Sequence, residues 1–142
     1  MSTYNAKCHC GQTEWTAELT KDQQGHVLCH CDTCKVLSGA PYTLNQIIPK
    51  KALKITKGDN LGKYTYKGDS GNGVHCYYCK NCTTHVYHHQ EALGADTIIL
   101  RTVLLNDGGL GAGLKPAAEI YGKARFGWEK EVAQTFETMP PS

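Results

Sequence analysis

The feature that most constrains this chain is the grouping of its cysteines. All eight lie in three short stretches: Cys8-His9-Cys10, Cys29-His30-Cys31-Asp32-Thr33-Cys34 and Cys76-Tyr77-Tyr78-Cys79-Lys80-Asn81-Cys82. Core packing does not explain such spacing, whereas short thiol turns from distant parts of a chain are typical of metal sites. Four disulfides are the rival interpretation, but two cysteines separated by one residue seldom have the geometry for a bridge. We therefore interpret the chain as a zinc protein.

Length and charge narrow the possible classes of protein further. A chain of 142 residues fits one domain, 1–142, and is long enough to build a core without staples. The net charge of +2 is too weak to indicate a nucleic-acid partner. The N-terminal residues have no apolar stretch and no window is long and apolar enough to cross a membrane, so we expect a cytoplasmic protein with reduced thiols. Nothing in the sequence indicates an oligomeric state.

The pattern of the remaining chain predicts a mainly β fold of antiparallel strands. Short runs of β-forming residues alternate with glycine-rich turns at about ten-residue spacing. Strands are expected at 13–19, 26–28, 42–48, 61–67, 97–105 and 118–123, with a lysine-faced strand around 50–57. The glycine-rich stretch 106–113 lacks the spacing of a dinucleotide fingerprint and is expected to be a flexible loop or lid. Trp128, Val132 and Phe136 permit a short helix, and a packed tail is the alternative.

Spacing indicates which cysteines share the first metal ion. A closed zinc site takes four ligands, and two short chelating turns can supply two thiolates each. Cys8 and Cys10 with Cys79 and Cys82 meet this requirement. Such a site would close a long loop and tie the first strand to the C-terminal half, so it should stabilise the fold strongly.

The second ligand set stays open at this point. Cys29, Cys31, Cys34 and Cys76 remain, and with Cys76 the second site would be closed and without metal chemistry. Without Cys76, three thiolates would leave a coordination position for a substrate. Further ligand candidates are His75 and His85, which are more often ordinary surface or core residues. His88 and His89 are expected to be a solvated pair.

These strings resemble those of a known family. CHCG at 8–11, CHCDTCKVLSGAPY at 29–42, YYCKNCTTHVY at 77–87 and the late Trp128 in a tail reaching 139–140 are similar to the glutathione-dependent formaldehyde-activating enzyme (GFA) and centromere protein V-like zinc domain family. The resemblance covers about residues 4–140. It implies a small β-tent domain, a structural zinc on Cys8, Cys10, Cys79 and Cys82, and a second, catalytic zinc on Cys29, Cys31 and Cys34. The chain departs from the family pattern at Thr83, where glycine is usual, and in the additional thiol of Cys76.

The resemblance also implies an activity, that of a zinc-dependent carbon–sulfur lyase. A zinc ion with three thiolates is a weak Lewis acid with a formal charge of −1, suited to a soft substrate thiol. The expected reaction is reversible C–S bond formation or cleavage on a small thiol adduct, such as a glutathione–aldehyde hemithioacetal. Tyr42, Tyr78 and the histidines are candidates for proton transfer. The alternatives are an enzyme of this fold acting on another substrate in a biosynthetic pathway, and a non-catalytic zinc module that binds a partner.

Overall fold

The computed structural model describes residues 1–105 and 109–142. Ten strands are present: β1 Ser2–Lys7, β2 Glu14–Leu19, β3 Gly25–Cys29, β4 Thr43–Pro49, β5 Leu53–Lys57, β6 Leu61–Lys67, β7 Gly73–Cys79, β8 His85–Gln90, β9 Thr97–Arg101 and β10 Lys115–Ile120. One α-helix, α1 Asp32–Ser38, and five 3-10 turns complete these elements. The prediction of a mainly β protein is confirmed. None of the described helices is long and apolar enough to cross a membrane.

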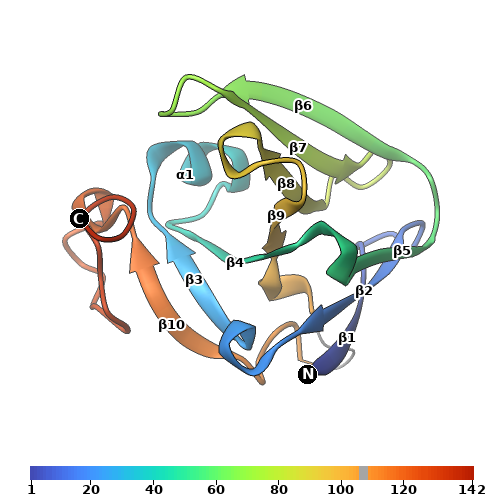
Figure 1. Ribbon diagram of the computed structural model, residues 1–142, viewed down its shortest axis with the longest axis horizontal. Helices are drawn as coiled ribbons and strands as arrows, with labels where there is room; N and C mark the ends of the chain where they lie inside the picture. The colour runs from blue at the N-terminus through green and yellow to red at the C-terminus, as the bar shows by residue number, and fades with distance from the viewer. Residues whose placement is uncertain (106–108) are drawn as a thin grey trace.

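The strands form two sheets. A three-stranded sheet has the order β1-β2-β5, and a seven-stranded sheet has the order β10-β3-β4-β9-β8-β7-β6. Neighbouring strands are antiparallel, as expected, except that β10 runs parallel to β3 at one edge of the long sheet. Figure 1 shows β6 and β7 along the top and β10 with the C-terminal tail at the left, so the long sheet is strongly curved.

The main core lies between the two sheets. Ala17 and Leu19 of β2 pack with Ile48, Ile98 and Leu100 of the long sheet, and all five are buried. Ile48 pairs with Ile98 across β4 and β9, and the next pair along, Ile47 and Ile99, points to the other face because side chains alternate along a strand. The long sheet therefore has a core face and an opposite face that is available for a site.

The apolar run 97–105 is not one strand, as predicted, but a strand and a turn. β9 ends at Arg101, and Thr102–Leu104 form a 3-10 turn that brings Leu105 into the core. Arg101 is buried and donates hydrogen bonds to Asn45 and to His85 Nδ1. The strand ends at the residue whose polar side chain makes these buried hydrogen bonds. The hydrophobicity of the run 97–105 does not indicate this end.

The late strand is displaced from its predicted position at 118–123. β10 spans Lys115–Ile120, and Tyr121 then adopts a left-handed conformation with φ 54°. Pro116 is tolerated because β10 is an edge strand whose outer side needs no ladder hydrogen bond. Part of the expected loop 106–113 lies outside the described residues. Its last part, 109–113, forms turns before β10.

The C-terminal tail follows the second sequence alternative, a packed tail without a helix. Its backbone continues along β10: Phe136 N donates to Glu119 O at 2.8 Å and Glu119 N donates to Gln134 O at 2.9 Å. These hydrogen bonds hold the tail extended, so the four-residue spacing of Trp128, Val132 and Phe136 does not form a helical face. Trp128 is 73% exposed.

Candidate metal centres and their cavity

The first group of thiols joins two distant turns. Cys8 and Cys10 follow β1, Cys79 ends β7 and Cys82 lies in the turn after it, and all four Sγ atoms lie within 4.8 Å of one another. The Cys8–Cys10 and Cys10–Cys79 Sγ distances are 3.6 and 3.7 Å. Zinc–sulfur bonds of about 2.3 Å in a tetrahedron place sulfurs about 3.8 Å apart. The donor set and its spacing therefore fit a structural zinc ion.

Hydrogen bonds around this first group favour thiolates. Thr13 N donates to Cys8 Sγ at 3.3 Å, and Asn60 Nδ2 donates to Cys79 Sγ at 3.6 Å. Hydrogen bonds from Thr84 lower the pKa of Cys82 to about 5. The group also packs with Trp15 and Val86 as a second core cluster. A cation bound here would be anchored to the core through Cys8 and Cys79, while Cys10 lies at the surface.

The second group consists of Cys29, Cys31 and Cys34, whose Sγ atoms also lie within 4.8 Å of one another. Cys29 ends β3, Cys31 caps the N-terminus of α1, and Cys34 N donates to Cys31 Sγ at 3.3 Å. Contacts with Cys29 and Cys31 lower the pKa of Cys34, while contacts with Cys31 and Cys34 raise the pKa of Cys29. Three adjacent thiols therefore cannot all ionise alone, and a divalent cation would remove this conflict.

Cys76 does not join this second group. It lies in β7 with 4% of its surface exposed, and burial raises the pKa of its thiol to about 11. Of the two alternatives that the sequence left open, the geometry therefore favours a group of three thiols. This arrangement fits a zinc ion with one coordination position left for a substrate.

His30, the histidine of the CHC motif, anchors the second group to β10 and the C-terminal tail through Glu119. His30 is 1% exposed and its Nε2 lies 2.7 Å from Glu119 Oε1, while its ring meets Tyr42 edge to face. Glu119 Oε2 also accepts hydrogen bonds from Val132 N at 2.6 Å and Ala133 N at 3.1 Å. One buried carboxylate thus connects the CHC turn to β10 and to the C-terminal tail. Sequence reasoning did not identify this pair, since its members are 89 residues apart.

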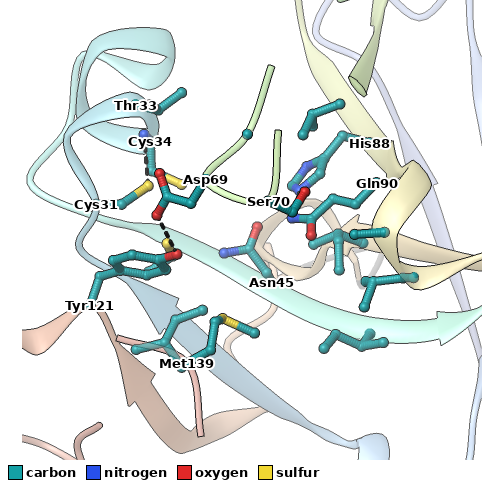
Figure 2. Close-up of a pocket in the computed structure, with 18 of the residues that line it drawn as sticks. Cys31, Thr33, Cys34, Asn45, Asp69, Ser70, His88, Gln90, Tyr121 and Met139 are labelled. Carbon is teal, nitrogen blue, oxygen red and sulfur yellow. Dashed lines mark hydrogen bonds between the residues drawn. The ribbon is translucent and has the colours of Figure 1, made fainter. Parts of the chain in front are cut away.

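The second group opens onto a cavity of about 370 Å³ on the outer face of the long sheet. Every strand of that sheet contributes to its lining: Val27, Asn45, Tyr66, Val74, His88, Ile99 and Ile120 come from β3, β4, β6, β7, β8, β9 and β10. Figure 2 shows Cys31 and Cys34 on one side of the cavity and His88 and Gln90 on the opposite side. The cavity is therefore a site with thiols at one end. The first group has no residue in its lining.

A tyrosine and a carboxylate lie beside these thiols. Tyr121 Oη donates to Asp69 Oδ2 at 2.8 Å, and Figure 2 shows both side chains next to Cys31 and Cys34. Burial and the bond to Asp69 raise the pKa of Tyr121 to about 12, so its hydroxyl stays protonated. Its left-handed backbone is rare for a residue with a side chain and often marks a functional site. Neither residue was a sequence candidate, because the turn 68–73 and the end of β10 meet only in the fold.

Of the proton-transfer candidates from the sequence, the two tyrosines and His75 lie elsewhere, whereas His88 lines the cavity. Tyr42 contacts His30, Tyr78 packs against Gly62, and neither lines the cavity. His75 bonds Glu91 Oε2 at 2.8 Å on the surface.

The expectation of a solvated pair is wrong for His88, which is 7% exposed and lines the cavity. Burial, with a smaller contribution from Arg101, lowers the pKa of His88 to about 3 and that of His85 to about 4. Both histidines are therefore neutral near pH 7. Strand alternation between Val86 and His88, both buried, is the signal that would have placed His88 inside.

Fold and site together define a small β protein with two thiol groups that could each hold a metal ion, one of four cysteines that joins two turns and one of three cysteines at a cavity. A family model described as "Glutathione-dependent formaldehyde-activating enzyme" matches residues 3–124. The chain belongs to this GFA family.

Individual relatives are more distant. Two fungal proteins that carry the family's name, from Emericella nidulans and Podospora anserina, are both 29% identical, over 84 and 86 residues. These matches cover 59% and 60% of this chain, and only 41% and 38% of the relatives' own length. A crystal structure of a Rhodobacter sphaeroides protein superposes with a TM-score of 0.56 at 20% identity, covering 71% of this chain and 86% of that one. That likeness supports the fold alone.

Proposed function

We propose that this protein is a zinc-dependent carbon–sulfur lyase that reversibly joins or separates a small thiol and an aldehyde. The observation that carries the proposal is the contrast between the two thiol groups. Four thiols form a complete ligand set, whereas three thiols stand at the end of a cavity. Membership of the GFA family supports the same class of reaction, with the glutathione–formaldehyde hemithioacetal as the reference substrate.

The residues around the cavity supply the other requirements of the reaction. A zinc ion held by Cys29, Cys31 and Cys34 would bind a substrate sulfur and lower the pKa of its thiol. In the cleavage direction the hydroxyl proton of the hemithioacetal passes to the Asp69 carboxylate, the C=O bond forms, and the C–S electron pair returns to sulfur. Tyr121 holds Asp69 in place through its 2.8 Å hydrogen bond. In the reverse direction Asp69 returns the proton to the oxygen.

Removing one thiol from the second group tests this proposal. Cys31→Ser should bind one zinc ion instead of two by native mass spectrometry and should lose exchange between formaldehyde and its glutathione hemithioacetal, followed by NMR. Cys76→Ser is the matched control, because Cys76 is also a cysteine but lies outside the group of three. It should keep both ions and the exchange rate. A Cys31→Ser protein with two zinc ions and full activity would sink the proposal.

The non-catalytic zinc module is the less favoured function. It would require the second group to be closed, and the thiol that could close it, Cys76, lies apart from the other three. A cavity of about 370 Å³ is also in the size range of small-molecule sites.

A further inference from the structure

The walls of the cavity are mainly apolar. Eight lining residues are aliphatic or methionine: Val27, Ile47, Val74, Ala92, Leu93, Ile99, Ile120 and Met139. They belong to five strands, the turn after β8 and the tail, so the apolar surface surrounds the space on several sides. A ligand that extends from the thiols into this space would meet hydrocarbon over much of its length.

Of the three amides in the lining, Asn45 and Gln46 have protein partners for both donor and acceptor, whereas Gln90 Nε2 lies 3.4 Å from His88 Nε2. Asn45 Nδ2 donates to Val27 O at 3.3 Å and to Thr43 Oγ1 at 2.9 Å, and its Oδ1 accepts from Arg101. Gln46 Nε2 donates to Gly25 O at 3.1 Å, and its Oε1 accepts from Ile47 N at 3.0 Å. The Asn45 and Gln46 amides are therefore not free to bind a polar ligand, so these two residues make the cavity less polar than their side chains alone would.

The charges in the lining are few and poorly matched to an anion. Among the described residues that surround the cavity, Lys67 is the one cation, and it is an exposed residue. His88 is neutral near pH 7, and Arg101 is directed at Asn45 and His85 and does not line the space. Asp69 adds a negative charge beside the thiols.

Glutathione is a demanding ligand for such a site. It carries two carboxylates and one ammonium group, and a buried carboxylate is costly unless it is paired. One exposed lysine can pair with one carboxylate at most, and Asp69 would repel the other.

We infer that the preferred substrate is an adduct of a thiol with an uncharged, largely apolar body, and that glutathione is a poor fit. This inference rests on the proposed function, since it names the substrate class of the same site. It predicts that the protein prefers apolar thiols to glutathione, the thiol in the family's name. The sulfur would lie at Cys29, Cys31 and Cys34 and the hydrocarbon would lie against Ile47 and Ile99.

The test measures thiol binding to the zinc-loaded protein by titration calorimetry, with native mass spectrometry confirming that both ions stay bound. Three probes are compared: glutathione, glutathione diethyl ester and 2-phenylethanethiol. The ester keeps the thiol and peptide of glutathione and removes both carboxylate charges. We expect the ester to bind at least tenfold more tightly than glutathione, and 2-phenylethanethiol at least as tightly as the ester.

A gain-of-charge variant sharpens the test. Ile47 lines the cavity and is 41% exposed, so Ile47→Arg should fold and should add a cation to the wall. It should reduce the ratio of the ester's affinity to that of glutathione at least threefold. Ile55→Arg is the matched control, because Ile55 is 37% exposed on β5 and lies outside the cavity, and it should leave the ratio unchanged.

The outcomes separate this inference from the proposed function. If glutathione binds as tightly as the ester or more tightly, the inference is overturned and the lyase proposal stands. If none of the three thiols binds a protein that holds two zinc ions, the proposed function fails and the inference fails with it. A change in Ile55→Arg equal to that in Ile47→Arg would also overturn the assignment of this cavity.

Discussion

Glu119 offers the sharpest test of how the second thiol group is held in place. Its carboxylate is fully buried and accepts hydrogen bonds from His30 Nε2 and from the backbone N–H groups of Val132 and Ala133. Arg125 Nη2 lies 3.4 Å from the same carboxylate. Replacing Glu119 by alanine would remove the acceptor of one buried donor, on His30, and of two partly buried backbone N–H groups, and would leave one cation without its partner.

The magnitude follows from those donors. A buried group left without its hydrogen bond costs about 1–3 kcal/mol, so three donors give a loss of about 3–6 kcal/mol after partial relaxation. Small domains have a free energy of unfolding of about 5–15 kcal/mol, so Glu119→Ala should lose much of this stability. Glu119→Gln keeps an acceptor oxygen but also places an NH₂ among donors, and should lose about 2 kcal/mol. Urea unfolding of the zinc-loaded proteins measures both values.

A second glutamate provides the control. Glu91 also bonds a histidine and a backbone N–H, at 2.8 Å to His75 and 3.0 Å to Gly73, but its side chain is 49% exposed. Water can replace its contacts, so Glu91→Ala should cost far less than Glu119→Ala. Equal losses in the two variants would refute the argument that burial makes the Glu119 contacts decisive. A Glu119→Gln protein that keeps full stability yet loses the second zinc would assign Glu119 to metal retention alone.

Three further predictions concern the turns, the pH response and the metal ions. Thr83 has φ 69°, a conformation that glycine adopts more easily, so Thr83→Gly should stabilise the fold by about 0.5–1 kcal/mol by thermal unfolding, whereas a loss would show that its contacts outweigh the strain. Because the folded pKa of His88 is lowered to about 3, the unfolded state binds more protons below pH 6.5, and stability should fall by up to about 1.4 kcal/mol per pH unit as pH drops from 6.5 towards 3. His88→Gln should flatten this slope, and an unchanged slope would contradict the assignment. Cys10→Ala should lose one zinc ion and much of the thermal stability, whereas Cys31→Ala should lose the other ion and keep the fold, as circular dichroism during heating would distinguish.

The sequence was sufficient to group the cysteines because short-range spacing carries that information. CxC and CxxC turns can hold two sulfurs close together whatever the rest of the fold does, and the structure gathers Cys8, Cys10, Cys79 and Cys82 as expected. Strand 61–67 was also readable, because alternating residues between two glycine turns leave little choice. The helix α1 was not predicted because it is only seven residues long and its N-cap, Cys31, is also one of the clustered cysteines, so Gly39 at its end was the one separate signal.

What could not be read from the sequence depends on long-range pairing. Tyr121 meets Asp69 across 52 positions, and His30 meets Glu119 across 89. Neither pair has a local motif, and both depend on β10 crossing to run parallel to β3. That parallel edge brings the residue after the strand to the thiols at the end of β3. The grouping of the cysteines was therefore predictable, whereas the groups that would support and assist them were not.

The position of the two thiol groups explains how one chain can separate stability from chemistry. The first group packs against Trp15 and Val86 through Cys8 and Cys79, so binding a cation there adds to the packing that holds β1, β2 and β7 together. The second group lies at the outer face of the long sheet and is fixed by His30 and Glu119 from behind, which leaves its front to the cavity. A cation could then be exposed to substrate without weakening the fold. Substitutions in the cavity wall, such as at Ile47, would accordingly change which thiol is accepted and leave the core unaltered.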